Sequence, residues 1–175
     1  MPGHRFADMS EPGFGVALLN DAKYGHSAKG NLLGLSLVRS PVYPDPLADE
    51  GGQRFTYALY PHAGDWYEGR VREEAEDLNQ PMLAATASGV AKVQFEPIGT
   101  EGIPAALSGF KPAEDGNGLI LRVYEPSGRR GDFVLNVPDG WTVSGSLNIL
   151  EEPMERGEGA DLRPFEVRSW RLVRG

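Results

Sequence analysis

Short apolar runs separated by turn residues are the main feature of the first part of the chain. They lie at Val16–Leu19, Leu32–Val38 and Phe55–Tyr60. Each run is bounded by Gly, Pro, Asn or Asp, a pattern typical of β-strands joined by turns. We therefore expect three strands here. Arg39 stands at the end of the second strand, before a loop rich in Pro, Asp and Gly, and such loops often carry binding surfaces.

One segment after these strands has a different spacing of apolar residues. Val71, Ala75 and Leu78 recur once per helical turn, and charged residues stand between them. This spacing predicts one short amphipathic helix near residues 67–79, with a solvated charged face. We expect the helix to end before Pro81, because proline disfavours the helical conformation of the residue that precedes it.

The rest of the chain predicts a series of strands, several of them with alternating apolar and polar residues. The expected strands are Ala91–Phe95, Ala105–Gly109, Leu119–Tyr124, Asp132–Val137, Thr142–Leu150 and Arg163–Val173. Together these patterns predict an all-β protein with one helix. We expect a β-sandwich region in residues 1–82, which includes the helix, and a smaller sandwich-like portion in residues 83–175.

Composition agrees with this fold class. The chain has 175 residues, of which 40% are hydrophobic and 24% are charged, and these values are close to those of globular domains. Its 23 glycines and 14 prolines indicate many turns. A chain with many turns and short apolar runs favours an all-β fold over a helical bundle.

The charge of the chain argues against two classes of partner. The formal net charge is −8, and Lys and Arg form no cluster along the sequence, so nucleic acid and anionic membranes are poor partners. We find no apolar run as long as a transmembrane helix and no apolar signal core at the N-terminus. The absence of cysteine excludes disulfides and fits a reducing compartment. We therefore expect a cytoplasmic protein.

Acidic residues in the loop after Arg39 are the first candidates for catalysis. Glycoside hydrolysis usually needs two carboxylates that face each other across the scissile bond, and Asp45, Asp49 and Glu50 lie close together in this loop. Nothing in the sequence fixes their separation. We interpret them as solvated loop acids and predict no catalytic residue.

A metal site could combine His4, His26 and His62 with Asp21 or Asp65. Zinc motifs normally contain two ligands close together in the sequence, and these histidines are far apart. We therefore predict no metal site and no cofactor in this chain.

Aromatic residues are the remaining candidates for sugar binding, because exposed rings stack on the faces of sugars. We expect most of the aromatic residues inside the expected strands to pack in the core or between sheets. Tyr24 and Tyr43 lie in loops, and we predict these two as substrate contacts.

Several motifs of the chain resemble one enzyme family. These are LLNDAKYGH, LSLVRSP and FTYALYPH in the first part, and LNQP, GLILRVYEP, NILEEP and RPFEVRSWRL further on. In this order and spacing they resemble the C-terminal β-domain of the α-mannosidases of glycoside hydrolase family 38. The resemblance implies that residues 1–82 are the C-terminal half of a large β-sandwich of the galactose-mutarotase-like super-sandwich type. The resemblance as a whole spans nearly the entire chain.

The resemblance also implies a function that depends on another part of the enzyme. The nucleophile, the acid/base residue and the zinc ligands of the family lie in an N-terminal barrel, which this chain does not contain. The implied partners are that catalytic domain and an α-mannoside, and self-association is a further expectation. The implied function is to support and rim an active site that belongs to the N-terminal domain.

Arg39 is the residue that the resemblance marks most clearly. In the family an arginine of this β-domain reaches the rim of the active site and bonds the mannose, and Arg39 stands in the matching region. Arg54, across the loop, is the alternative. A purely structural role is also possible for Arg39, which could form a surface ion pair with Asp45 or Asp49. Asp21 is a further candidate substrate contact, although forming the turn after LLN also explains it.

Two other functions stay open at this point. The chain could be a free-standing carbohydrate-binding module, which needs a groove lined by exposed aromatic rings. It could also be a structural domain that docks on a catalytic domain, which needs an exposed apolar surface.

Overall fold

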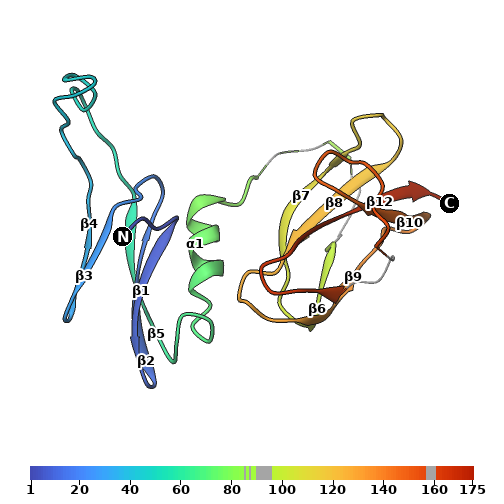
Figure 1. Ribbon diagram of the computed structural model, residues 1–175, viewed down its shortest axis with the longest axis horizontal. Helices are drawn as coiled ribbons and strands as arrows, with labels where there is room; N and C mark the ends of the chain where they lie inside the picture. The colour runs from blue at the N-terminus through green and yellow to red at the C-terminus, as the bar shows by residue number, and fades with distance from the viewer. Residues whose placement is uncertain (85, 87, 90–95, 157–160) are drawn as a thin grey trace. The chain divides into compact units, whose positions relative to one another are not determined.

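The computed structural model describes residues 1–84, 86, 88, 89, 96–156 and 161–175. The chain divides into two compact units, Met1–Ser88 and Gly89–Gly175. Strands dominate both units, and one short helix belongs to the first, which confirms the predicted all-β class (Figure 1). No helix among these residues is long and apolar enough to span a membrane.

The first unit contains a three-stranded antiparallel sheet with the order β1-β2-β5, a two-stranded hairpin of β3 and β4, and the helix α1. Their bounds are β1 Phe6–Glu11, β2 Phe14–Asn20, β3 His26–Lys29, β4 Leu32–Leu35, β5 Tyr57–His62 and α1 Val71–Asn79. In Figure 1, α1 lies along one side of the sheet and the β3–β4 hairpin lies on its other side.

Side-chain alternation along β2 gives this sheet two apolar faces. Ala17 and Leu19 face the helix, where they form a buried cluster with Val71 and Ala75. Leu18 points to the opposite face and pairs with Leu59 of β5. Because one face is covered by α1, the apolar residues of the other face depend on the hairpin, or on a partner, for burial.

The helix is shorter than the sequence predicts at its N-terminal end. Residue Arg70 has a left-handed backbone with φ of 54°, which sets the start of α1 at Val71. Before it, the carboxylate of Asp65 accepts hydrogen bonds from the backbone N–H groups of Tyr67 and Glu68, both at 2.9 Å. These bonds fold the residues before α1 into a turn instead of a first helical turn. The C-terminal end at Asn79 agrees with the prediction.

The predicted strand Leu32–Val38 is wrong in its second half. Strand β4 ends at Leu35, which pairs with His26, the first residue of β3. Since β3 has only four residues, none of the strands that the structure describes pairs with the residues after β4, and these continue as a loop.

The second unit is a β-sandwich of two sheets. One sheet has the order β10-β12-β8-β7, and the other has the order β11-β9-β6. The bounds are β6 Ile98–Gly102, β7 Ala106–Pro112, β8 Leu119–Tyr124, β9 Gly131–Leu135, β10 Trp141–Leu147, β11 Asp161–Leu162 and β12 Val167–Arg174. The core between the sheets contains Leu121, Val123, Phe133, Leu162, Trp170 and Leu172.

Three predicted strands of this unit run past an end of the observed strand. The prediction Asp132–Val137 exceeds β9 by two residues at its C-terminal end, where the N–H of Asn136 bonds the carbonyl of Pro97. The prediction Thr142–Leu150 runs past the end of β10, because the side-chain oxygen of Asn148 accepts hydrogen bonds from the N–H groups of Leu150 and Glu152 and forms a turn. The prediction Arg163–Val173 begins too early, because the N–H of Glu166 bonds the carbonyl of Arg163 in another turn. The predicted strand Ala91–Phe95 lies outside the described residues.

A buried carboxylate fixes the loop after β8. Glu125 is 1% exposed, and its two oxygens accept hydrogen bonds from the N–H groups of Ser127, Gly128 and Phe165 at 2.6–3.1 Å and from the Ser127 hydroxyl at 2.5 Å. Burial alone would raise the pKa of Glu125, but these hydrogen bonds outweigh it and hold the pKa below its ordinary value of 4.5.

We therefore expect Glu125→Gln to lower the free energy of unfolding of the second unit by about 1–3 kcal/mol, because an amide leaves buried donors without an acceptor. A lowered pKa stabilises the fold above the ordinary value of 4.5 and loses this contribution as the pH falls through the folded-state pKa. The stability lost between neutral and acidic pH should thus be smaller in Glu125→Gln. Denaturant unfolding at several pH values measures both effects. Equal pH dependence in the two proteins would contradict this role, and the exposed Glu101→Gln is the control.

Candidate functional site

The turn that follows β2 is held firmly in place. Asn20 is 1% exposed, and its side-chain oxygen accepts a hydrogen bond from the N–H of Lys23 at 2.6 Å. Its side-chain nitrogen lies 3.3 Å from Nε2 of His26. The side chain of Asn79, at the end of α1, donates to the Asn20 carbonyl at 3.0 Å. The LLND motif is therefore a corner fixed by buried polar contacts.

Asp21 joins this corner to the residues before β5. Its carboxylate accepts a hydrogen bond from the N–H of Thr56 at 3.2 Å, and its own N–H donates to the carbonyl of Thr56 at 3.2 Å. Hydrogen bonds to Thr56 lower the pKa of Asp21, and the positive charge of Arg54 contributes to the same shift. The structure thus bonds Asp21 to the main chain, as expected if this residue forms the turn.

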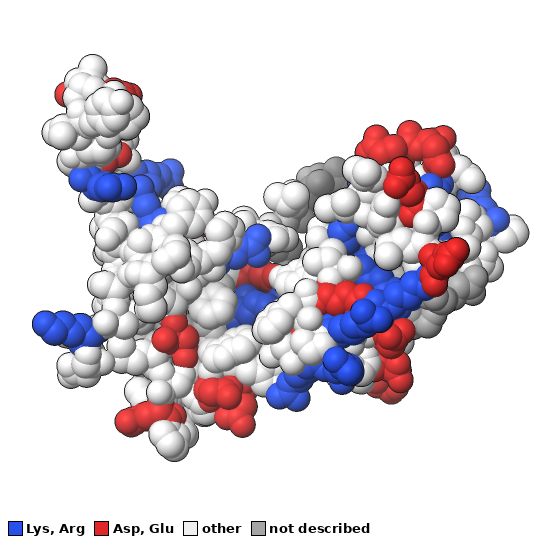
Figure 2. All heavy atoms as spheres, viewed as in Figure 1, with Lys and Arg blue, Asp and Glu red and all other residues white. Residues whose placement is uncertain are grey.

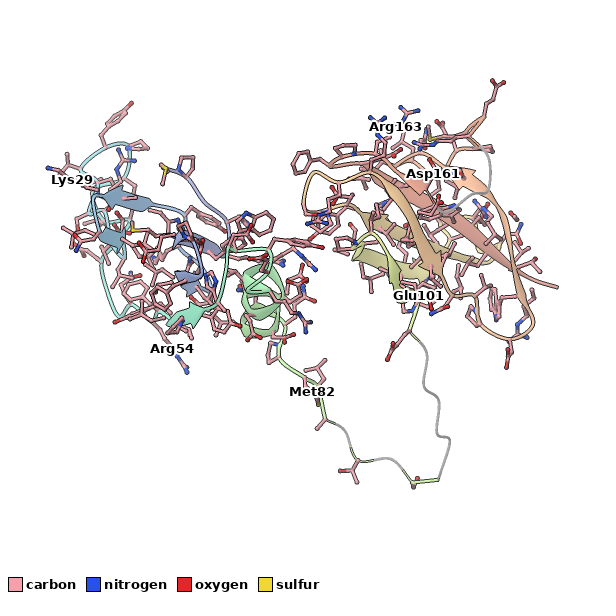
Figure 3. The ribbon with its side chains drawn as sticks, turned by 90° about the horizontal axis from the view of Figure 1, so that it is seen from below. Lys29, Arg54, Met82, Glu101, Asp161 and Arg163 are labelled. Carbon is pink, nitrogen blue, oxygen red and sulfur yellow. The ribbon has the colours of Figure 1, made fainter. Side chains whose placement is uncertain are left out.

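Two further contacts surround this corner. The ammonium of Lys23 lies 4.5 Å from the centre of the Phe55 ring, and the ring of Tyr24 stacks on His4 at 5.1 Å between centroids. Tyr24 is 57% exposed. The exposed Arg54 side chain extends outward from the first unit (Figure 3).

Arg39 and Tyr43 lie in the long loop between β4 and β5. The carboxylate of Asp49 accepts hydrogen bonds from the backbone N–H groups of Arg39, at 3.2 Å, and Ser40, at 2.6 Å. No salt bridge joins Arg39 to Asp45 or Asp49 in the part of the chain that the structure describes. The ion pair proposed from the sequence is therefore wrong, and Asp49 instead closes the loop through the main chain.

The guanidinium of Arg39 is left exposed by this arrangement, and Tyr43 is 86% exposed. Within the described ranges, no hydrogen bond, ion pair or ring contact joins Arg39 or Tyr43 to Asp21, Tyr24 or Arg54. The candidate substrate contacts thus form two groups, one at the LLND corner and one in the long loop. Both are polar or aromatic surfaces that could add contacts to a site, and neither has paired catalytic groups.

The loop acids serve the backbone of their own loop. The carboxylate of Asp45 accepts a hydrogen bond from the N–H of Leu47 at 2.9 Å, and Asp49 binds the two N–H groups named above. These contacts fit the interpretation of Asp45 and Asp49 as loop acids. The described residues also contain no group of three His, Asp or Glu side chains that could hold a metal ion.

A buried pair on the helix side of the first sheet was not predicted from the sequence. Nε2 of His62 lies 2.8 Å from the carboxylate of Asp8, and the side chains are 1% and 10% exposed. The ring fits between two glycines, since a Cβ at Gly15 or Gly69 would lie 2.2 Å or 2.3 Å from its atoms. The sequence signal was weak, because Asp8 and His62 are 54 positions apart. The pair is a structural part of the sheet.

The family of the chain follows from comparisons with known proteins. Residues 1–47 match the profile of the glycosyl hydrolases family 38 C-terminal domain, and residues 105–170 match that of the family 38 C-terminal beta sandwich domain. Alpha-mannosidase 2C1 of Homo sapiens is 38% identical over 182 residues. Alpha-mannosidase G of Dictyostelium discoideum is 35% identical over 189 residues.

These alignments cover 97% and 98% of this chain, but only 18% and 17% of the two relatives. The crystal structure of a family 38 glycosyl hydrolase from Enterococcus faecalis has the same fold, with a TM-score of 0.78 over 97% of this chain and 22% of the other, at 23% identity. The chain therefore belongs to glycosyl hydrolase family 38 and represents part of the C-terminal region of that family.

Proposed function

We propose that this chain is the non-catalytic C-terminal portion of an α-mannosidase, and that it supports and rims an active site formed by an N-terminal catalytic portion. The observation that carries the proposal is the coverage of the relatives. Nearly all of this chain aligns with proteins named alpha-mannosidases, yet it spans 17–18% of their length.

The geometry of the candidate site supports a position at the edge of an active site that another part of the enzyme forms. The candidate contacts lie in loops and at a turn, their side chains are exposed, and the loop acids are bonded to the main chain. We propose that Arg39, with Arg54 as the alternative, contacts the α-mannoside, and that Asp21, Tyr24 and Tyr43 lie near it. We also propose that zinc is bound in the N-terminal portion and that the enzyme acts in the cytoplasm.

A free-standing carbohydrate-binding module has less support. Such a module presents several exposed rings in one groove. Tyr24 stacks on His4 at the LLND corner, whereas Tyr43 lies in the long loop. The two predicted ring contacts therefore belong to separate groups.

We expect this chain by itself to hydrolyse no aryl α-mannoside, with or without added zinc. At the two groups of candidate contacts, the described carboxylates of Asp21, Asp45 and Asp49 are bonded to backbone N–H groups, whereas glycoside hydrolysis needs two carboxylates that face the scissile bond. A spectrophotometric assay of released phenol measures this directly. Turnover that persists through repurification and disappears in Asp45→Ala or Asp49→Ala would show that the chain has its own active site.

A further inference from the structure

One face of the β1-β2-β5 sheet is apolar and largely exposed. We call it the open face, and define it by the residues that point away from α1 and are exposed or line the adjacent groove: Met9, Phe14, Val16, Tyr57 and Leu59. Phe14 is 51% exposed, Tyr57 58% and Leu59 70%. Large apolar side chains gathered on one face usually mark an interaction site.

A groove of about 480 Å³ lies between the open face and the tip of the β3–β4 hairpin. Strands β1, β2 and β5 supply one wall, and Gly30, Asn31 and Leu33 supply the other. Glu11 is the one charged residue among those that line it. In Figure 2 the visible surface over the middle of the first unit is mostly white, and Lys, Arg, Asp and Glu stand at its margins. The groove therefore fits an apolar partner and not a charged peptide.

The opposite face of the same sheet is covered by α1, whereas the open face has no comparable cover among the described residues. On the covered face, Ala17 and Leu19 are at most 4% exposed under α1. Sheets that are apolar on both faces are normally covered on both faces. Leu35 of the hairpin and Leu37 of the loop after it lie near Leu18 and Tyr57 and cover part of the open face. Phe14 and Leu59 remain in solvent.

We infer that the open face is the surface on which the N-terminal portion of the same enzyme docks, an inference that rests on the function proposed above. The family 38 match over residues 1–47 contains every groove residue except Leu59. In the alpha-mannosidases that align with this chain, more than four-fifths of the protein lies outside the aligned region. An apolar surface of that remaining portion is the occupant that this chemistry fits.

Co-expression tests the inference. The probe is a tagged human alpha-mannosidase 2C1 that lacks the region matching this chain, and it is produced together with the chain. We expect the wild-type chain to co-purify with it in equal amount. Leu59→Lys and Phe14→Ser should lower the association constant by about 30-fold or more, as replacement of a central apolar contact does in other interfaces. The matched control is Leu150→Lys, because Leu150 is 74% exposed but belongs to the second unit.

Thermal unfolding of the chain alone provides the second measurement. Leu59→Lys should leave its Tm unchanged, because the side chain is already exposed, so that lost binding cannot be assigned to unfolding. Equal binding by wild type and Leu59→Lys would overturn the inference, as would failure of the wild-type chain to bind. A dimer of the chain that Leu59→Lys dissociates, without binding to the probe, would assign the face to a second copy and also overturn it. A complex that forms through the open face but hydrolyses no α-mannoside would instead contradict the proposed function alone.

Discussion

Replacing Trp170 with alanine is expected to lower the free energy of unfolding of the second unit by about 3–5 kcal/mol. Trp170 is 0% exposed and lies at the centre of the core between the two sheets. Its ring is 5.6 Å from that of Phe133 on the facing sheet, and the guanidinium of Arg168 lies 4.9 Å from it on the same strand. Alanine would remove apolar area and leave a cavity that these neighbours cannot fill.

Circular dichroism during denaturant unfolding measures this loss without depending on tryptophan fluorescence. The control is Phe165→Ala, because the Phe165 side chain is 71% exposed and its removal should change stability by no more than about 0.5 kcal/mol. A loss below about 1 kcal/mol in Trp170→Ala would show that the sandwich core does not depend on this side chain.

Replacing Arg39 with alanine in the assembled enzyme is expected to lower kcat/KM for an aryl α-mannoside by roughly 10- to 150-fold. A charge-assisted hydrogen bond to a sugar hydroxyl contributes about 1.5–3 kcal/mol. In the chain itself the guanidinium is exposed and its backbone N–H is bonded to Asp49, so the side chain is available for substrate. Removing a solvated arginine should cost the fold itself at most about 1 kcal/mol.

Two variants make this kinetic test specific. Arg39→Lys should restore little activity if both arms of the guanidinium bond the sugar, because a lysine offers a single point of charge. Arg54→Ala distinguishes the two candidate arginines. A large loss in Arg54→Ala, with unchanged kinetics in Arg39→Ala, would transfer the contact to Arg54. No loss in either variant would mean that neither arginine contacts the substrate in a way that affects turnover.

The strands that were predicted well are those whose apolar residues form compact runs. Val16–Leu19 lies inside β2 and Leu119–Tyr124 coincides with β8, because both strands carry core residues. Strands β3 and β6, with the sequences HSAK and IGTEG, were not predicted. They contain few apolar residues, and their conformation depends on pairing with β4 and β9. Pairing of this kind is a tertiary effect that local sequence does not encode.

The exposure of the candidate contacts could be predicted from the sequence, but their hydrogen bonds could not. The position of Arg39 in an exposed loop could be expected from the residues Ser40-Pro41 that follow it. The contact between Asp49 and the backbone of Arg39 could not, because an acid ten residues away can bond either a side chain or a backbone N–H group. The open face did have a signal. Four consecutive apolar residues at Val16–Leu19 indicate a strand that needs cover on both faces.

Whether this chain completes an active site is tested by the rate of aryl α-mannoside hydrolysis by the chain alone, by the truncated human alpha-mannosidase 2C1 alone, and by the two co-expressed, all with zinc present. We expect no turnover for either part alone and turnover for the purified complex, because we propose that the chain completes a site formed by the N-terminal portion. A complex that stays inactive, or an N-terminal portion that is as active alone as in the complex, would contradict this proposal.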